Sequence, residues 1–461
     1  MKFYFREKEL ELLEKLNQNR PTFTVIYGKR RVGKTELIKQ FSKNKKTFYI
    51  YVDNNKPEEE LLKEYTKLLN EEILNDEFNI NFKNFKDFLK FILKQNIIIV
   101  FDEFQRFIKI NPSIINYFQE ILDLQENKAN LIVSGSAYGM IKKIFIENEA
   151  PLFKRADLNL KLKDFSFNEI KIILKDLGIK DIEEQIKIYS IFGGSIFYYN
   201  LIEKFNCKSY NDILENLFLN EISPLKYEVK EWFIEQFGKL NKTYFQILYA
   251  ISKGKNTKKE ISDYTQIKET SLHPYLEDLI ELLGVIEFVL PITEKENSKK
   301  GRYVLNHNFF KFWFRFIYEN ENLYQIKDFI KLKEKINLNF NDYLGFIFEN
   351  LVKEYLIKEN SNLPFKFENC SNWWNKKGLE IDLIGINSKE KKIFFCECKY
   401  KNEKTGVEVL NNLKEKSKAV NWLNHNRKEY FYLFSKNGFT QDLIKVSKKN
   451  ENIKLFNLMD F

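Results

Sequence analysis

The sequence predicts a multidomain α/β protein that begins with a parallel sheet flanked by helices and ends with a smaller α/β layer. Three observations predict this fold class. The glycine-rich segment GKRRVGKT, 28–35, lies between a short β-branched run and a helical pattern. An unbroken apolar run at 97–101 ends in two carboxylates. Near the C-terminus, two predicted strands around a polar turn carry an aspartate and a Glu-x-Lys sequence.

Length and composition indicate a folded protein of several domains. The chain has 461 residues, of which 44% are hydrophobic and 30% are charged, and at roughly 100–200 residues per domain it predicts about three domains. Its four cysteines are few and scattered, which favours a reducing compartment without disulfides. They also lack the spacing of zinc ligands. No apolar run reaches the roughly 18 residues of a membrane span, and the N-terminus lacks a signal core. We therefore expect a cytoplasmic protein.

The formal net charge is +10, which favours a polyanionic partner such as nucleic acid. A Lys- and Glu-rich surface that is simply solvated predicts the same charge, so this alternative stays open. Charge alone therefore favours a DNA partner without establishing one.

The segment 28–35 fits the phosphate-loop pattern of glycine, four residues and Gly-Lys-Thr. Backbone amides of such a loop face phosphate at a helix N-terminus, Lys34 would reach the β and γ phosphates, and Thr35 would ligate Mg²⁺. The residues expected to bind nucleotide here are Gly28, Lys29, Arg30, Arg31, Val32, Gly33, Lys34 and Thr35.

The apolar run at 97–101 is typical of a buried parallel strand, and it ends at Asp102 and Glu103. We expect Asp102 to hold magnesium and Glu103 to orient the attacking water. A helix N-cap after a strand is the alternative for this pair. The phosphate loop in the same chain favours the nucleotide site.

Two further segments supply candidates for contact with the γ-phosphate. The apolar strand at 131–136 contains Ser134 and Ser136, which we expect to sense this phosphate from the adjacent strand. The loop sequence PLFKR makes Arg155 a candidate arginine finger, because arginine suits a developing phosphoryl charge. An ordinary surface arginine is the alternative for Arg155.

In this order, FREKELELL (5–13), YGKRRVGKTELI, IIIVFDEFQ, LIVSGS and PLFKR resemble the archaeal-type ATPases of the AAA+/STAND superfamily. The resemblance implies a P-loop NTPase core, a magnesium-dependent ATP site, an adenine pocket near Phe5 and Arg6, and a helical lid. In that family a Gly-Gly segment with a proline usually closes the lid. This chain has GGSIFYY at 193–199, where Ile196 replaces the proline.

The segment 241–305 has the pattern of helix, turn, helix, turn, helix and two strands, which predicts a winged helix. Thr257 and Glu260 fit a capping box, and Pro274 fits the first turn of the next helix. If this unit binds DNA, the wing residues expected to touch phosphate are Lys299, Lys300 and Arg302.

The same segment also fits a protein contact or a spacer, because the helix expected to enter the major groove carries the acidic residues Glu277, Asp278 and Glu281. The aromatic run at 309–318 is too short to span a bilayer. We expect it to form a helix that seals the seam with the C-terminal region.

The sequences LEIDLIGI (379–386) and IFFCECKY (393–400) predict a hairpin. Antiparallel pairing of its strands would bring Asp382 beside Glu397 and Lys399. With a nearby acidic helix, this arrangement resembles the PD-(D/E)XK nuclease fold, which is the restriction-endonuclease-like fold.

Two carboxylates forced close together repel each other unless a divalent cation lies between them. We therefore expect Mg²⁺ on Asp382 and Glu397, with support from Glu349 of the acidic helix. Lys399 would orient or help deprotonate the attacking water. The alternative is a structural ion pair between Glu397 and Lys399, which needs no metal.

These predictions divide the chain into an ATPase core (1–160), a helical lid (161–235), a winged helix with an aromatic linker (236–330) and a nuclease-like domain (331–461). The leading hypothesis is an ATP-hydrolysing switch that controls a DNA-acting domain, with Mg²⁺-dependent deoxyribonuclease activity left open. The alternative is a signalling or scaffold ATPase of STAND type whose C-terminal domain only binds a partner. ATP and Mg²⁺ are the expected ligands, DNA or a protein is the expected partner, and homo-oligomerisation stays open.

Overall fold

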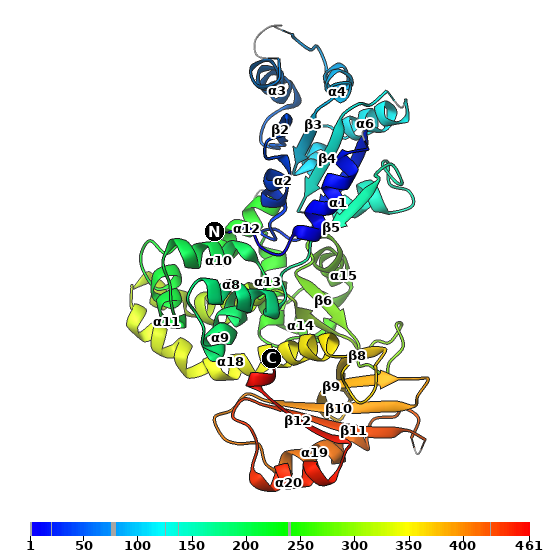
Figure 1. Cartoon of the computed structure of the whole chain (residues 1–461). Helices are drawn as coiled ribbons and strands as arrows, with labels where there is room; N and C mark the ends of the chain where they lie inside the picture. The colour runs from blue at the N-terminus through cyan, green and yellow to red at the C-terminus, as the bar shows by residue number, and fades with distance from the viewer. Residues whose placement is uncertain are drawn as a thin grey trace. The chain divides into compact units, whose positions relative to one another are not determined.

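The computed structural model of the chain describes residues 2–19, 21–74, 80–124, 126–136, 138–237, 241–424 and 426–461 (Figure 1). The chain forms two compact units. The first comprises Met1–Phe165, Ser195–Leu201 and Pro274–Gly284, and the second comprises Ser166–Gly194, Ile202–His273 and Val285–Phe461. The four predicted domain ranges stay a prediction. Within the described residues, no helix is long and apolar enough to cross a membrane.

The first unit is built on a parallel sheet whose described strands have the order β2-β3-β4-β1-β5. They are β1 (Thr22–Tyr27), β2 (Thr47–Tyr51), β3 (Ile98–Asp102), β4 (Asn130–Gly135) and β5 (Leu158–Lys161). Strands β1, β3 and β4 are buried along their whole length, as expected of parallel strands with helices on both faces. The predicted parallel sheet flanked by helices is confirmed.

Helices cover both faces of this sheet because successive side chains of a strand point to opposite faces. On one face, Ile98 and Val100 of β3 pack with α1 (Glu7–Asn17) and α2 (Lys34–Ser42). On the other face, Ile99 and Phe101 pack with α3 (Glu58–Glu72), α4 (Phe85–Leu93) and α6 (Ser113–Asp123). The shorter elements are a 3₁₀ turn at Phe104–Arg106, α5 (Phe107–Ile110), α7 (Tyr138–Ile141) and a π-helical turn at Lys142–Ile146.

The second unit begins with helices that follow the sheet in sequence. They are α8 (Phe167–Asp176), α9 (Ile182–Phe192), α11 (Tyr210–Ile213), α12 (Glu228–Phe237), α13 (Lys242–Ser252), α14 (Lys258–Thr265), α16 (Asn308–Phe312), α17 (Glu321–Gln325) and α18 (Phe329–Lys358). Helices α10 (Ile196–Lys204) and α15 (Glu269–Glu277) each include residues of both units. π-Helical turns lie at Leu214–Phe218, Asp278–Leu282 and Trp313–Ile317, and a 3₁₀ turn at Tyr318–Asn320.

The start of α14 agrees with the sequence pattern, whereas the start of α15 does not. The side chain of Thr257 caps α14 and Glu260 completes the capping box. Helix α15 begins at Glu269, so Pro274 lies in the helix interior and the prediction of a first-turn position is wrong. A proline there removes one backbone donor, and the acidic Glu269 provides an alternative helix start because it suits the positive end of the helix dipole.

The hairpin of β6 (Ile286–Val289) and β7 (Arg302–Leu305) is present where the wing was expected, although its identity as a wing stays a prediction. Its tip packs against the C-terminal sheet, since Trp374 Nε1 donates to the carbonyl of Lys300 at 3.1 Å. The guanidinium of Arg302 lies 4.5 Å from the Trp374 ring and pairs with Glu380 at 2.7 Å. Lys300 pairs with Glu294 at 2.6 Å. The expectation of phosphate contacts from Lys300 and Arg302 is therefore not supported.

The C-terminal sheet has the strand order β12-β11-β10-β9-β8 in the described residues. Its elements are β8 (Asn369–Trp374), β9 (Glu380–Asn387), β10 (Lys392–Lys399), α19 (Val407–Ser417), β11 (Lys428–Ser435), α20 (Gln441–Lys449), β12 (Ile453–Asn457) and a 3₁₀ turn at Leu458–Asp460. Strands β8, β9 and β10 are antiparallel, whereas β10, β11 and β12 are parallel. The predicted hairpin of β9 and β10 is confirmed.

Opposite faces of this sheet pack against different helices. On one face, Phe395 belongs to a core that includes Leu410 and Leu413 of α19. On the other face, Phe348 of α18 lies 5.3 Å from the ring of Tyr400. The sheet therefore has α19 on one face and α18 on the other.

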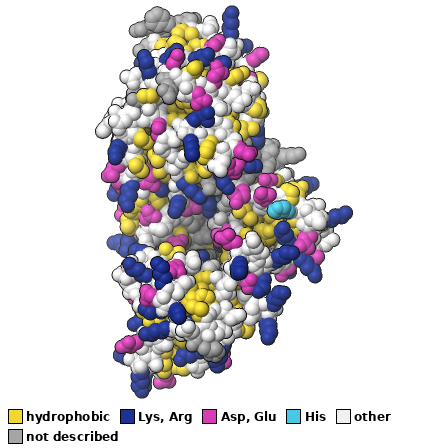
Figure 2. All heavy atoms as spheres, turned by 90° about the vertical axis from the view of Figure 1, so that its right-hand side faces the viewer, with side chains coloured by type: hydrophobic (Ala, Val, Ile, Leu, Met, Phe, Trp, Pro, Cys, Tyr) yellow, Lys and Arg dark blue, Asp and Glu magenta, His cyan; other side chains and the backbone are white. Residues whose placement is uncertain are grey.

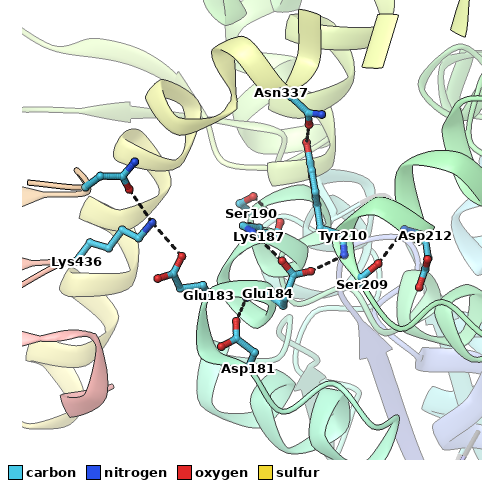
Figure 3. Close-up of polar contacts among 11 residues, drawn as sticks. Asp181, Glu183, Glu184, Lys187, Ser190, Ser209, Tyr210, Asp212, Asn337 and Lys436 are labelled. Atoms are coloured by element: carbon cyan, nitrogen blue, oxygen red, sulfur yellow. Dashed lines mark hydrogen bonds and ion pairs between the residues drawn. The ribbon is translucent and has the colours of Figure 1, made fainter. Parts of the chain in front are cut away.

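Helices α8 and α9 contact α18 and the C-terminal sheet, and Figure 3 shows the contact of α9 with Lys436. Lys436, in the turn after β11, pairs with Glu183 of α9 at 2.9 Å. Glu354 of α18 accepts hydrogen bonds from Tyr189 Oη at 3.0 Å and from the amide of Phe167 at 3.1 Å. These contacts tie α8 and α9 to the C-terminal part of the second unit.

Charged side chains of both signs are interspersed over the face shown in Figure 2. Lysine and arginine side chains lie among aspartate and glutamate side chains there, rather than forming one continuous basic stripe. This distribution agrees with the solvated basic surface that was kept as an alternative to a nucleic-acid face.

Candidate functional sites

The phosphate-loop sequence lies between β1 and α2, at the carboxyl end of the parallel sheet. A Cβ at Gly28 would lie 2.4 Å from the carbonyl oxygen of Leu162, so only glycine fits there. Gly33 caps α2 with φ 98°, a conformation that other residues rarely adopt. The loop therefore needs both glycines to turn from the strand into the helix.

Lys34 begins α2 and is buried under the loop, with 6% of its surface exposed. Its Nζ donates to the carbonyls of Gly28 and Lys29, both at 3.0 Å. Burial lowers the pKa of Lys34, while the carboxylates of Glu103 and Asp102 oppose this shift. The ammonium group is thus held at the centre of the loop, where phosphate oxygens would replace the two carbonyls.

Asp102 ends β3 and receives hydrogen bonds from donors on several elements. Thr35 Oγ1 donates to Oδ2 at 3.0 Å, Tyr49 Oη donates to the same oxygen, and Ser134 Oγ donates to Oδ1. Burial and the Asp102 charge raise the pKa of Tyr49, so the phenol stays a donor. Hydroxyl and carboxylate oxygens are the ligands that Mg²⁺ prefers, and the pair of Thr35 and Asp102 fits this ion.

Glu103 follows in a left-handed conformation, with φ 59°. Its Oε2 accepts hydrogen bonds from Gln105 Nε2 at 2.5 Å and from Ser136 Oγ at 2.8 Å. Ser134 donates to Asp102 and Ser136 donates to Glu103, and their expected contact with the γ-phosphate stays a prediction. Sequence reasoning missed Gln105 and Tyr49, since no motif links either residue to the site.

The segment 195–201 lies beside the loop in the first unit. The guanidinium carbon of Arg31 is 3.7 Å from the ring centroid of Phe197, and Ile196 Cγ2 is 3.5 Å from the position of a Cβ at Gly33. Lys29 pairs with Asp164 at 3.5 Å. Ile196, at the place where the resembled family has proline, therefore still lies against the loop.

Arg6 lies close to the loop from the N-terminal side. It is buried, and its guanidinium donates to the carbonyls of Lys163 at 2.7 Å and Val32 at 3.4 Å. The same group lies 4.4 Å from the ring of Phe165, which also contacts Phe5. An adenine pocket near Phe5 and Arg6 stays a prediction that this arrangement supports.

Arg155 lies near the amino-terminal ends of the strands, whereas Lys34 lies at their carboxyl ends. It forms a two-bond ion pair with Asp123 at 2.8 and 2.9 Å. Asp157, two residues later, accepts from the amide of Phe23 near the start of β1, and the strand rises about 13 Å from there to the loop. Arg155 is therefore not brought to the nucleotide site of its own chain.

In the C-terminal sheet, the register of β9 and β10 brings Asp382 and Glu397 together. Cys396 pairs with Leu383, and Asp382 Oδ2 accepts the amide hydrogen of Cys398 at 2.7 Å. Glu397 is 6% exposed and accepts from Lys399 Nζ at 2.7 Å. The carboxylates of Asp382 and Glu397 are close enough for their charges to interact, while their role as a metal site stays a prediction.

Lys416, in the last turn of α19, is a further cation at this site. Its Nζ lies 3.2 Å from Oε1 and 3.1 Å from Oε2 of Glu397. Sequence reasoning did not place Lys416 at this site, since no motif links α19 to the hairpin. The ion pair of Glu397 with Lys399, kept as the alternative to a metal site, is also present.

The carboxylates of this second site perturb one another. Burial, followed by the charges of Asp382 and Glu397, raises the pKa of Glu349 to about 8. Burial and the charge of Glu397 raise the pKa of Asp382 to about 6, although the Cys398 amide opposes this. Glu349, which lies on α18, is thus electrostatically part of the site.

The carboxylate oxygens of this site are of the type that a hard divalent cation prefers, but they do not form a complete set of protein ligands. Among the described residues, no three His, Cys, Asp or Glu side chains converge to hold a metal ion. Mg²⁺ commonly uses only one or two carboxylates and completes its shell with water and substrate phosphate. Asp382 and Glu397 fit this lower requirement.

Two family models match the chain, one over its N-terminal part and one over its C-terminal part. Residues 3–203 match a family model described as an ATPase domain predominantly from Archaea. Residues 313–416 match a model described as "Archaea bacterial proteins of unknown function". The second range includes Glu349, Asp382, Glu397 and Lys399, so the carboxylate site lies within a recognised family segment.

Two curated relatives and one solved structure are similar to the chain. "Uncharacterized protein MJECL04" of Methanocaldococcus jannaschii is 36% identical over 469 residues, which cover 100% of both chains. "Uncharacterized ATP-binding protein MJ0439" of the same organism is 28% identical over 299 residues, which cover 52% of this chain and 81% of the relative. The Walker-type ATPase PABY2304 of Pyrococcus abyssi aligns with a TM-score of 0.51 at 20% identity, over 68% of this chain and 96% of that chain. The last match shows a shared fold.

Proposed function

The chain belongs to the same family as MJECL04 and contains an ATPase domain of predominantly archaeal type, and we propose that it is a Mg²⁺-dependent ATP-hydrolysing switch whose nucleotide state controls a DNA-acting C-terminal domain. One observation carries the first half of this proposal. Lys34, Thr35, Asp102 and Glu103 meet at the carboxyl ends of β1 and β3, the parallel strands on either side of β4, where ligands bind in open α/β sheets.

Each residue of the nucleotide site has a separate task in this proposal. The loop amides and Lys34 bind the β and γ phosphates, and Thr35 and Asp102 would hold Mg²⁺. The cation, when bound, neutralises charge on the phosphates. Glu103 orients the attacking water. To do so, its carboxylate gives up the hydrogen bond from Ser136 and accepts one from the water. Arg155 would act on the site of a second copy of the chain.

ATP hydrolysis by the purified protein tests this first half. Wild-type protein should hydrolyse ATP only with Mg²⁺ present. Lys34→Ala should lose nucleotide binding, whereas Glu103→Gln should keep binding and lose hydrolysis. Binding of ATP that survives Lys34→Ala would contradict the assignment of the loop.

For the C-terminal domain, we propose Mg²⁺-dependent cleavage of a phosphodiester. Asp382 and Glu397 would hold the cation, Glu349 would support it from α18, and Lys399 would orient the attacking water. Support comes from the β9–β10 register and from the pKa values that these carboxylates raise in one another. The order of helix, antiparallel strands, helix and parallel strand also resembles the PD-(D/E)XK nuclease fold.

A specific observation favours the second candidate function, a signalling or scaffold ATPase. Glu397 is already neutralised by two lysines, and no three carboxylates of the described residues form a metal cage. The two candidates differ in cleavage and in metal binding. Asp382→Ala and Lys399→Ala should each abolish Mg²⁺-dependent DNA cleavage. If wild-type protein neither cleaves DNA nor binds Mn²⁺ through Glu397, the scaffold function is favoured.

A further inference from the structure

Glu397 receives two ammonium groups from two different elements. Lys399 follows it on β10, with its Nζ 2.7 Å from Oε1. Lys416 comes from α19, with its Nζ 3.2 Å from Oε1 and 3.1 Å from Oε2. Both lysines therefore contact the same carboxylate, although they come from different elements.

The position of Lys416 is not explained by the helix end alone. Cations are favoured in the last turn of a helix, and Lys418 next to that turn shows the usual outcome. The side chain of Lys418 is 70% exposed and pairs with Glu415, three residues earlier. The side chain of Lys416 is only 19% exposed and pairs with Glu397 on the face of β10 that α19 covers. Ordering a long lysine side chain costs rotamer entropy, which the contact of Lys416 with Glu397 compensates at this partly buried position.

The charge balance of the site indicates what the second lysine can do. With a divalent cation bound, which favours the ionised carboxylates, Asp382, Glu397 and Glu349 carry three negative charges, against two positive charges on the lysines. A divalent cation on the carboxylates would leave one net positive charge. A phosphodiester carries one negative charge and would neutralise it. Without Lys416, the site with its cation would already be neutral.

We propose that Lys416 binds a phosphate oxygen of a nucleic-acid phosphodiester, and that Glu397 holds its ammonium group beside the site until a divalent cation takes its place on the carboxylate. This inference rests on the proposed DNA-acting function of the C-terminal domain. Lysine suits the task because it is a compact point charge on a flexible stem and commonly binds phosphate. A divalent cation competes with Lys416 for the same two oxygens of Glu397, so its binding releases the ammonium group toward the phosphate.

If Lys416 and the cation compete for Glu397, a substitution of Lys416 should raise the affinity for metal and lower the affinity for DNA. A purely structural ion pair does not predict this opposite change. The experiment uses full-length Lys416→Gln, Lys416→Arg and the matched control Lys418→Gln, all without nucleotide. Mn²⁺ binding is measured by calorimetry, with Glu397→Gln protein as the blank for other manganese sites. Binding of a short fluorescent DNA duplex is measured by anisotropy with Ca²⁺ present, over a series of salt concentrations.

Lys416→Gln should bind Mn²⁺ about threefold more tightly and DNA about tenfold more weakly, and the slope of log affinity against log salt should become shallower by about 0.9. Lys416→Arg should keep the wild-type slope, and Lys418→Gln should leave both affinities unchanged. Melting temperature and ATP hydrolysis check folding, and Lys416→Met replaces the glutamine variant if the latter unfolds.

Wild-type DNA affinity and slope in Lys416→Gln would overturn the proposal while leaving metal-dependent function intact. Absence of Glu397-dependent Mn²⁺ binding in the wild type would instead end the proposed metal-dependent function. Wild-type protein that binds no DNA overturns both. If inorganic phosphate at a matching concentration removes the effect of Lys416→Gln on DNA affinity, the ligand is free phosphate, and the nucleic-acid assignment is wrong.

Discussion

Glu349 should make the stability of the protein fall as pH rises through neutrality. Its pKa is about 8 in the folded chain and 4.5 as the unperturbed value. Between these pH values the folded chain keeps the proton that the unfolded chain has lost, so the free energy of unfolding decreases by about 1.4 kcal/mol per pH unit. From about pH 5.5 to about pH 7.5 the decrease is up to about 3 kcal/mol.

Urea unfolding at several pH values measures this effect, followed by tryptophan fluorescence, since Trp373 and Trp374 lie in the C-terminal sheet. Glu349→Gln should flatten the pH dependence and stabilise the protein near pH 7.5. Glu334→Gln, an exposed residue of the same helix, is the matched control and should change neither. Added Mg²⁺ should lessen the pH dependence of the wild type, because a cation favours the ionised carboxylates. Equal pH dependence in wild type and Glu349→Gln would refute the assignment of Glu349 to the carboxylate site.

Three further changes follow from contacts in the structure. Tyr49→Phe removes a hydroxyl that donates to Asp102, so it should lower the free energy of unfolding by about 1.5–3 kcal/mol and, because Asp102 loses a positioning contact, slow ATP hydrolysis. Ser136→Ala removes a donor that holds Glu103 and should raise basal ATP hydrolysis several-fold, whereas a decrease would show that the hydroxyl assists the reaction. Lys436→Met removes a partly buried ion pair with α9, and it should lower the free energy of unfolding by about 0.5–1 kcal/mol in low salt and by less in high salt.

The nucleotide site was largely predictable because its signals are local. A strand, a glycine-rich turn and a helix follow one another within 22–42, so the loop around Lys34 needs no knowledge of distant contacts. The apolar run before Asp102 identifies a buried parallel strand for the same reason. The pairing of Asp382 with Glu397 was predictable because a short turn sets the register of a hairpin.

The remaining contacts depend on tertiary packing that no local pattern encodes. Tyr49 and Gln105 reach the acidic pair from β2 and from the turn after β3, and Lys416 reaches Glu397 across a helix–sheet interface. Arg155 was placed by its residue type, whereas the ion pair with Asp123 holds it near the amino-terminal ends of the strands. In each case the direction of a side chain depends on neighbours far away in sequence.

The wing residues show the same limit. Lys300 and Arg302 looked available for phosphate because the sequence showed only a charged hairpin tip. Trp374, far along the chain, stacks on Arg302 and binds the carbonyl of Lys300. The tip of the predicted wing therefore packs on the C-terminal sheet.

DNA cleavage by the full-length protein, with and without ATP in the presence of Mg²⁺, tests the central claim most directly. The proposed switch predicts that ATP changes the cleavage rate of the wild type. Lys34→Ala should make that rate independent of ATP, and Lys399→Ala should abolish cleavage while ATP hydrolysis continues. Cleavage that is equal with and without ATP, or that persists in Lys399→Ala, would contradict the account.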